Sequence, residues 1–524
     1  MVTTRQVRIA SQTLTFGLWV ALILVTKHPI ENALTRNIPV SLFLRMDPLV
    51  TTVVSGGMRM LISITMLGFV TLAISLVMGR VFCGWVCPLG TVFDFVGWWL
   101  RKFRIKFEGP SPWYFRFKYY LLAATLILAA AGAVHPLMGF DPIVIITRVA
   151  ATLINPFLRA HDEILWATGD SAKRYGMFID VATLVLFVLI LGATTRLSRI
   201  WCRVACPLGA YLAVSSRYSM LRRDTVGCVH CGICANHCPT GAINFENAEI
   251  YNESECIKCF ACTQECPVDA NFFTWKSPLP VTAHAHHPVS LDRRAFIGTA
   301  AAAVVAAPAL NLAAGKSSAE KTLLRPPMSR EERDFLLSCI RCNNCTKSCP
   351  TGILKPAVFE HGVRAFWSPV MVPTEGLCEP GCNACSQACP TDAIMKYPIE
   401  DKYRFKMGTA VFESNRCVAY TENKFCNECV RVCPTDAIAV IPGWEPETKG
   451  VKRGADVPAP PGQTPSRPER VHFEACVACG ACENVCDKIV YGEPAMVTTS
   501  FGRAVPTVLD EKYYQRLGKF GFES

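Results

Sequence analysis

The sequence predicts an α-helical membrane domain joined to small α+β domains that fold around clusters of cysteine. Three observations lead to this fold class. Of the 524 residues, 51% are hydrophobic and only 18% are charged, which excludes a mainly disordered chain. Long apolar runs without charge occupy the amino-terminal part, and 28 cysteines recur at fixed spacings. The formal charge of +11 does not indicate nucleic-acid binding, because membrane proteins concentrate Lys and Arg in cytoplasmic loops.

Four apolar runs, each about one bilayer width as a helix, predict four membrane spans. The runs are residues 9–26, 60–79, 119–134 and 181–195. A cleavable signal peptide competes for the first run, but no small-residue cleavage site follows Thr26. Buried helices of a soluble core are the alternative for all four. Basic residues gather between the second and third runs and after the fourth, which puts the amino terminus and both of these loops in the cytoplasm.

The membrane region is an internal duplication. Residues 46–50 (MDPLV) match residues 140–144 (FDPIV), and residues 82–90 (FCGWVCPLG) match residues 201–209 (WCRVACPLG). Both copies run in the same direction, so we expect a pseudo-twofold axis along the membrane normal, in two parallel repeats. This axis would bring together the two Asp-Pro segments on the outer side and four cysteines at the cytoplasmic end. These cysteines are Cys83, Cys87, Cys202 and Cys206.

The four converging cysteines predict one more bound centre, of the iron–sulfur kind. On a helix, cysteines at positions i and i+4 share a face, which suits a site with two ligands from each repeat. Redox-active dithiols and small packing residues are the alternatives for these four side chains.

Two runs of four cysteines follow the membrane region with the spacing Cys-x2-Cys-x2-Cys-x3-Cys-Pro, which is typical of bacterial ferredoxins with [4Fe–4S] clusters. Three thiolates on one tight loop hold three irons, and the fourth cysteine reaches the neighbouring cluster. A zinc site, the alternative, usually shows two separated cysteine pairs. One predicted cluster takes Cys228, Cys231, Cys234 and Cys266, and the other takes Cys256, Cys259, Cys262 and Cys238.

Four more runs in the carboxy-terminal half predict four further clusters, six [4Fe–4S] clusters in all. The second of these runs lengthens its first gap by one residue, the third widens it to eight intervening residues, and Asp487 replaces the proline after the last. These differences alter loop shape and leave the number of ligands unchanged. The runs are Cys339, Cys342, Cys345 and Cys349; Cys378, Cys382, Cys385 and Cys389; Cys417, Cys426, Cys429 and Cys433; and Cys476, Cys479, Cys482 and Cys486.

Between the two halves, adjacent arginines at 293 and 294 precede Phe296 and an Ala-rich stretch that ends near Ala314. This pattern resembles an internal twin-arginine export signal. An ordinary fifth span is one alternative, and an Ala-rich linker without a crossing is another. Either of the first two would put the residues after about 316 outside the cytoplasm. The predicted domains are 1–220 (membrane), 221–275 (two clusters), 276–316 (linker with signal or span) and 317–524 (four clusters).

Two acids and two histidines are candidates for a quinol site. His28 and His135 stand at the outer ends of spans, and Asp47 and Asp141 belong to the duplicated Asp-Pro segments. Ionisable groups at such depth are functional candidates and could accept the protons of a quinol. Helix capping or turn formation is the competing interpretation of both aspartates. No P-loop, GxGxxG, covalent haem motif or Ser/His/Asp elbow is found in the sequence.

Residues 1 to about 275 resemble the NapH-type membrane ferredoxin of periplasmic nitrate reductase systems, on the two Cys-x-x-x-Cys-Pro motifs after paired spans and the two ferredoxin runs. Residues from about 290 resemble the exported NapG-type ferredoxin, which carries four clusters and a twin-arginine leader. In that family the runs are thought to pair first with fourth and second with third. Carried over, Cys349 would join Cys476, Cys479 and Cys482; Cys486 would join Cys339, Cys342 and Cys345; Cys389 would join Cys417, Cys426 and Cys429; and Cys433 would join Cys378, Cys382 and Cys385.

Residues and resemblance together imply a membrane-bound iron–sulfur electron-transfer protein of the cytoplasmic membrane. We expect it to oxidise quinol and to relay electrons to an extracytoplasmic reductase, dehydrogenase or cytochrome. The expected partners are this acceptor, the quinone pool and membrane lipid, and no nucleic acid. A redox maturation or regulatory factor for a metalloenzyme and a relay from a cytoplasmic donor to quinone are the alternatives.

Overall fold

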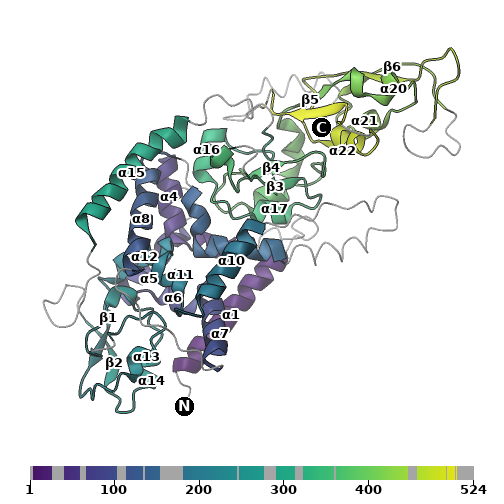
Figure 1. Ribbon diagram of the computed structural model, residues 1–524. Coiled ribbons are helices and arrows are strands. Elements are labelled where there is room, and N and C mark those ends of the chain that lie inside the picture. Colours follow the sequence, from purple (N-terminus) through teal and green to yellow (C-terminus); the bar gives the residue numbers. More distant parts are fainter. Residues whose placement is uncertain are drawn as a thin grey trace.

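The computed structural model shows a helical bundle with a small cysteine-rich body at each end (Figure 1). The amino terminus lies at the lower end of this view, beside the first body, and the last strands lie at the far upper end. The structure describes residues 4–25, 41–59, 66–102, 114–133, 136–153, 181–244, 247–276, 291–312, 323–358, 362–446, 457–490, 493–501 and 503.

The bundle contains both copies of the duplication. In each copy an apolar helix follows an Asp-Pro step, a second apolar helix follows, and a short helix then leads through Cys-Pro into a third. The first copy comprises α3 (Leu42–Arg45), α4 (Pro48–Met58), α5 (Leu67–Met78), α6 (Val81–Trp85) and α7 (Pro88–Lys102). The second comprises η2 (Pro136–Phe140), the helix Pro142–Leu153, α10 (Val181–Ala193), α11 (Ile200–Val204) and α12 (Pro207–Ser216). Helices α1 (Thr4–Val25) and α8 (Tyr114–Ala130) precede the two copies.

Within the described ranges, one helix is long and apolar enough to cross a membrane, at Thr4–Leu24. Four shorter apolar helices accompany it, at Pro48–Met58, Leu67–Met78, Pro142–Leu153 and Val181–Ala193. The predicted first, second and fourth spans therefore correspond to helices, and α8 covers most of the third. Their number as membrane crossings stays a prediction.

Helix α15 (Arg293–Leu312) begins at the twin arginines and runs along α8 (Figure 1). The Asp292 amide donates to the Tyr120 hydroxyl at 3.2 Å near one end of α8, and Ala303 and Ala307 pack with Leu128 and Ala133 near the other. Its 20 residues give a length of about 30 Å. The segment between the two ferredoxin halves is therefore an integral helix of the bundle over these residues.

The first cysteine-rich body, residues 221–276, is α+β as predicted. Strands β1 (Leu221–Thr225) and β2 (Asn271–Trp275) pair antiparallel, with Leu221 opposite Trp275. The cysteine runs lie between these strands and form short helices at their third cysteines, α13 (Ile233–Asn236) and α14 (Ala261–Gln264). The 3-10 helix η3 (Glu253–Glu255) directly precedes the second run.

The predicted four-cluster domain is built as two lobes (Figure 1). The inner lobe, residues 323–407, lies against the bundle, and the outer lobe, residues 408–503, extends away from it. The inner lobe contains α16 (Glu332–Ser338), α17 (Asn344–Ser348), β3 (Leu354–Pro356), α18 (Gly362–Ala365), β4 (Pro369–Met371), α19 (Ala384–Ala388) and η5 (Ile399–Arg404). The outer lobe contains β5 (Thr409–Phe412), η6 (Ser414–Arg416), α20 (Val418–Thr421), α21 (Glu428–Arg431), β6 (Ile438–Ile441), β7 (Arg467–Val471), α22 (Ala481–Asp487) and β8 (Met496–Thr499). Strand β3 pairs with β4, β5 with β8, and β6 with β7, all antiparallel.

A buried group of charges fastens the first body to the bundle. The Glu255 carboxylate of η3 accepts from Arg80 at 3.0 Å and from the Lys118 ammonium at 2.6 Å. All three side chains are at most 1% exposed. A buried charge is tolerated only when it is paired, so these contacts fix where the body sits.

Replacing Glu255 with Gln should therefore destabilise this junction. The substitution leaves Arg80 and Lys118 buried without their carboxylate, and breaking a buried ion pair costs about 3–5 kcal/mol. Thermal unfolding of the detergent-solubilised protein measures the effect. Glu249→Gln, at a half-exposed acid of the same body, is the matched control and should change stability by less than about 0.5 kcal/mol. Equal unfolding midpoints for wild type and Glu255→Gln would contradict the role of this contact.

Candidate metal centres

The thiols of the first body gather as the ferredoxin spacing predicts. Cys262 lies within electrostatic range of Cys256 and Cys259 of its own run and of Cys238 from the preceding run. Burial raises the pKa of the Cys256 thiol to about 12. In the other set, Cys234 interacts with Cys228 and Cys231. That Cys266 completes this set stays a prediction.

The inner lobe places its eight thiols around two cavities. One cavity is lined by three cysteines of the first carboxy-terminal run and the last of the second, namely Cys339, Cys342, Cys345 and Cys389. The other cavity is lined by the reciprocal set, Cys378, Cys382, Cys385 and Cys349. The first two runs therefore exchange their fourth cysteines with each other.

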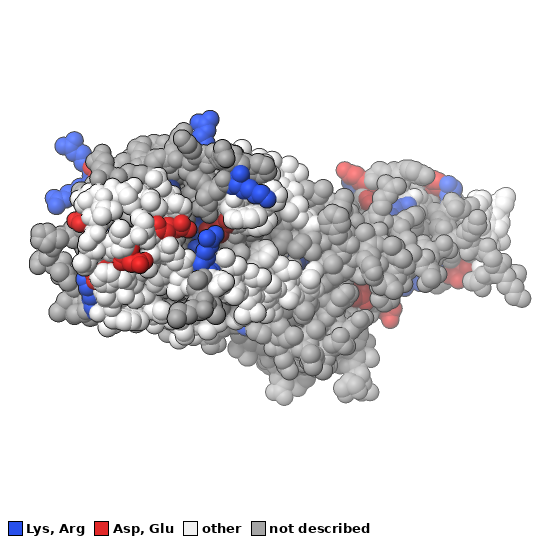
Figure 2. Space-filling view, turned by 90° about the horizontal axis from the view of Figure 1, so that it is seen from below, with Lys and Arg blue, Asp and Glu red and all other residues white. Residues whose placement is uncertain are grey.

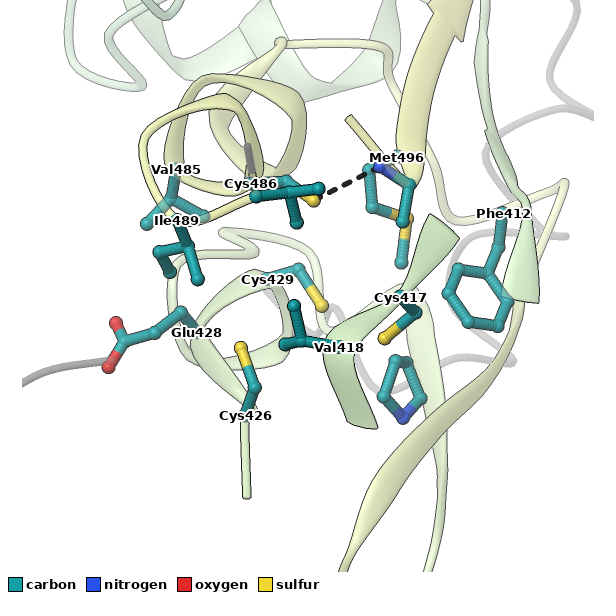
Figure 3. Close-up of a pocket in the computed structure, with 13 residues that line it drawn as sticks. Phe412, Cys417, Val418, Cys426, Glu428, Cys429, Val485, Cys486, Ile489 and Met496 are labelled. Carbon is teal, nitrogen blue, oxygen red and sulfur yellow. Dashed lines mark hydrogen bonds between the residues drawn. The ribbon is translucent and has the colours of Figure 1, made fainter. Parts of the chain in front are cut away.

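The outer lobe repeats this arrangement with the third and fourth runs. Figure 3 shows the sulfurs of Cys417, Cys426, Cys429 and Cys486 around one space, which is the cavity that these side chains line. Cys433 of the third run in turn interacts with the first three cysteines of the fourth run, Cys476, Cys479 and Cys482.

The pairing of first with fourth run and second with third, which the family resemblance implied, is therefore wrong for this chain. The cause is helix packing. Helix α17 contacts α19, and α21 contacts α22. Each helix therefore ends beside the cluster loop of the helix that it packs against. Cys349 directly follows α17 and Cys389 directly follows α19, which lets each reach across to the other set.

Hydrogen bonds to sulfur in these sets fit iron–sulfur clusters. Backbone N–H groups donate to the sulfur of the crossing cysteines, from Ala242 to Cys238 at 3.2 Å and from Ala437 to Cys433 at 3.3 Å. Such bonds stabilise a thiolate and tune the potential of a cluster. Within the described ranges no three His, Cys, Asp or Glu side chains are placed to hold a single metal ion.

The bundle brings the four cysteines of the duplication together. Cys202 interacts with Cys83, Cys87 with Cys83 and Cys202, and Cys206 with both Cys83 and Cys202. All four belong to one buried core and are at most 9% exposed. Helix α6 carries Cys83 and α11 carries Cys202, whereas Cys87 and Cys206 lie beyond these helices, directly before α7 and α12. Each repeat therefore contributes two of the four thiols, although the two do not share one helix as expected.

Two buried arginines, which the sequence reasoning did not single out, cross between the repeats beside these thiols. Arg199 donates from Nη1 to the Cys83 carbonyl at 3.0 Å and from Nη2 to the Gly90 carbonyl at 3.1 Å. Arg80 occupies the equivalent position of the first repeat, and its Nη2 lies 3.0 Å from the place that a Cβ would take at Gly209. Each guanidinium therefore reaches the Cys-Pro turn of the opposite repeat. A matching Arg three residues before each first cysteine is the sequence feature that could have revealed them.

Around the four thiols, basic side chains outnumber acidic ones. Arg199 and Arg8 share the carboxylate of Asp94, and Arg80 and Lys118 share that of Glu255. Buried cations in excess of their carboxylates require further negative charge nearby. Four thiolates on an iron–sulfur centre would supply it, so the residues fit such a centre.

The candidate quinol residues divide into two groups. Asp47 and Asp141 are fully buried and interact electrostatically with each other, as the pseudo-twofold axis predicts. The Oδ2 atom of each carboxyl group has no hydrogen-bond partner. Each also caps a helix: Asp47 accepts from the Leu49 amide at 2.8 Å, and Asp141 accepts from the Ile143 amide at 2.9 Å. The capping interpretation is thus confirmed. His28 and His135 lie outside the described residues.

Contacts connect the sets of thiols in order from the first body, through the bundle, to the outer lobe. The Cys256 set reaches the bundle where Ile257 packs on Gly84, between Cys83 and Cys87. The bundle set shares its buried core with Cys342 of the inner lobe. The two lobes meet where the Cys378 amide donates to the Cys479 carbonyl at 2.8 Å.

Comparisons with known proteins agree with this description. A 4Fe–4S binding domain model matches residues 60–106 and 179–225, which hold the two cysteine pairs of the bundle. Models of 4Fe–4S dicluster domains match residues 220–267, 252–353 and 377–437. No solved structure matches the chain.

Three relatives show the kind of protein that it resembles. The methylamine utilization ferredoxin-type protein MauN of Methylobacillus flagellatus is 29% identical over 31% of this chain and 48% of its own length. The regulatory protein NosR of Stutzerimonas stutzeri is 29% identical over 35% of this chain and 23% of its own. The chain thus spans less than half of these two relatives. It covers 81% of the ferredoxin-type protein NapG of Escherichia coli, at 31% identity over 39% of this chain. The chain therefore belongs to the NapG-type family of ferredoxin proteins, which transfer electrons through several [4Fe–4S] clusters.

Proposed function

We propose that this protein is a membrane-bound electron conduit. All 28 cysteines, in seven sets of four, would hold six [4Fe–4S] clusters and a seventh iron–sulfur centre inside the bundle. The observation that carries the proposal is the linear order of the sets, from the first body through the bundle to the outer lobe (Figure 1). A chain that only stored iron or bound a partner would not need its sets in line.

Each cluster supplies one-electron redox chemistry when bound. The protein's own part is to fix the order of the clusters and to adjust their environment. The exchanged fourth cysteines tie neighbouring clusters together in pairs, amide donors such as Ala437 stabilise the thiolates, and burial keeps water away from sulfur. At the bundle set, Arg80 and Arg199 offset negative charge, which favours the reduced state of the centre.

Three features support a position across the membrane. Helices α5 and α10 leave large apolar side chains exposed on the outside of the bundle, among them Val70 at 53%, Val188 at 64% and Leu189 at 65%. Extended apolar surface of this kind marks contact with lipid or another protein. The helix Thr4–Leu24 is long and apolar enough for one crossing, and basic loops accompany the end that carries the first body. The first body would then face the cytoplasm and the two lobes would face the other side.

The view of the molecule from below shows the charges at the first body's end (Figure 2). Acidic side chains lie near the middle of this face, and basic side chains lie mostly around its rim.

Quinol is the proposed donor, and an extracytoplasmic reductase, dehydrogenase or cytochrome is the proposed acceptor. Oxidation of a quinol releases two electrons, which the centres would take one at a time, and two protons. Asp47 and Asp141 support this donor because they are two neighbouring buried carboxyl groups, and the Oδ2 atom of each has no hydrogen-bond partner and could take up a proton. Asp141 also lies within electrostatic range of Cys206.

A quinol analogue should promptly bleach the visible absorption of the anaerobic, detergent-solubilised protein. The variant Asp47→Asn tests the carboxyl pair, because Asn caps a helix as well as Asp does but accepts no proton. We expect this variant to be bleached more slowly by quinol and at the wild-type rate by dithionite. Bleaching by dithionite but not by quinol in the wild type would place the quinol site in another subunit.

The exchange of fourth cysteines can be tested by iron content. Cys342→Ala and Cys389→Ala should remove the same cluster, so their combination should lose no more iron than either alone. Cys342→Ala combined with Cys486→Ala should lose the iron of two clusters, because these ligands belong to different sets. The opposite result, additive loss for the first pair and shared loss for the second, would restore the pairing of first with fourth run.

A regulatory or maturation role is the second candidate, favoured by the similarity to the regulatory protein NosR. Deletion of residues 316–524 separates the two. A maturation factor that works through the bundle keeps its activity without the lobes, whereas a conduit loses all electron delivery to the acceptor.

A further inference from the structure

Three aromatic rings connect the bundle thiols to the inner lobe. Trp201 directly precedes Cys202, and its ring stacks on Phe140 with centroids 6.4 Å apart and an interplanar angle of 29°. Phe140 then meets Trp367 edge to face, again at 6.4 Å between centroids. We call Trp201, Phe140 and Trp367 the aromatic bridge. Its members come from α11, η2 and the loop after α18, so three distant parts of the chain build it.

The inner-lobe end of the aromatic bridge is tied to a cluster loop. Arg341 stands between Cys339 and Cys342, and its Nε donates to the Phe366 carbonyl at 3.0 Å. The same guanidinium donates from Nη1 to the Cys339 carbonyl at 3.3 Å. Trp367 is therefore held beside the set of Cys339, Cys342, Cys345 and Cys389. Ile340 and Cys342 belong to the same buried core as the four bundle thiols.

The bundle end of Trp367 is equally constrained. The Arg148 guanidinium lies 3.7 Å from the centre of the Trp367 ring and donates to the Gly139 carbonyl at 2.6 Å. A Cβ at Gly139 would stand 3.0 Å from the Trp367 ring, so a residue with no side chain is what allows the ring to come this close. Trp201 is 8% exposed and Trp367 is 7% exposed, which keeps the junction dry.

We propose that the aromatic bridge is the route by which electrons pass between the bundle centre and the inner-lobe cluster of Cys339, Cys342, Cys345 and Cys389. This inference rests on the proposed conduit and deepens it. One electron leaves one iron–sulfur centre and arrives at the next, no proton moves, and no ring is oxidised. Tunnelling decays less through bonded, closely packed atoms than across gaps. The three rings form a line of contacts from Trp201, next to Cys202, to Trp367, next to the Phe366 carbonyl that Arg341 binds. They are positioning residues, since none of them is a ligand.

The alternative is that the rings only fasten the lobe to the bundle. The two roles differ in what the loss of the aromatic ring does to electron transfer. Trp367→Leu keeps an apolar side chain at the junction but leaves part of the space empty, whereas Trp367→Phe keeps a ring. If the rings only pack, both variants affect stability and iron content. If they carry electrons, Trp367→Leu slows transfer even when every cluster is present.

The experiment uses the full-length, iron-loaded protein in lipid vesicles. Cytochrome c is trapped inside, titanium(III) citrate is added outside, and haem absorption reports each electron that crosses. We expect Trp367→Leu to lose most of the wild-type flux and Trp367→Phe to keep the larger part of it. Trp444→Leu is the matched control, because Trp444 meets Phe425 edge to face at 6.4 Å in the outer lobe, away from the junction. It should conduct like the wild type.

Iron content and the low-temperature EPR spectrum of the dithionite-reduced protein accompany each flux. If Trp367→Leu loses iron, Phe140→Leu replaces it as the test, since Phe140 belongs to the bundle and is distant in sequence from the cluster loops of the inner lobe. Full iron with reduced flux in either variant supports the aromatic bridge. Full iron with wild-type flux in both overturns it and leaves the conduit intact. Wild-type vesicles that pass no electrons would instead refute the proposed function.

Discussion

The crossing of Arg80 and Arg199 between the two repeats is the interaction on which the rest of the structure depends. Each guanidinium is buried and reaches the Cys-Pro turn of the opposite repeat. Each is also held by an acid that belongs to another element: Asp94 joins Arg199 to the amino-terminal helix through Arg8, and Glu255 joins Arg80 to the first body. One pair of side chains thus fixes the repeats to each other, gathers the four thiols and docks the first ferredoxin body.

This arrangement would let the bundle hold the proposed anionic centre away from water. Burial of four thiolates on iron is unfavourable unless positive charge lies close by. The two arginines supply it without becoming ligands. The same charges require the first body to stay in place, since Glu255 would otherwise leave Arg80 and Lys118 unpaired. The order of centres therefore follows from electrostatics at the junction as much as from the spacing of cysteines.

The sequence predicted the elements whose signals are local. The spacing of Cys228 to Cys238 specified a cluster loop, and the matching segments around Cys83 and Cys202 predicted the duplication and the convergence of their thiols. The Asp-Pro pairs were assigned both a capping and a catalytic interpretation, and the structure confirms the capping. The first body begins with β1 at Leu221, and the described part of the inner lobe begins at Leu323, while the predicted domain boundaries stay a prediction.

What the sequence could not show depends on packing between distant segments. Every run ends in a cysteine that can reach a neighbouring set, but which neighbour it reaches depends on whether α17 packs against α19 or elsewhere. The spacing is the same in either case, so the pairing taken from the resemblance had no local signal to correct it. Trp201, Phe140 and Trp367 likewise come from three segments without a shared motif. Their contact becomes visible only when the lobe is seated on the bundle.

The most direct test of the account is an electron cryomicroscopy map of the anaerobically purified, iron-loaded protein. The account predicts seven iron–sulfur densities in one line, with Cys389 bound beside Cys339 and Cys486 beside Cys417. It also predicts one density between the four cysteines of the bundle, flanked by Arg80 and Arg199. A map with no density at the bundle cysteines, or with Cys486 bound beside Cys339, would contradict it.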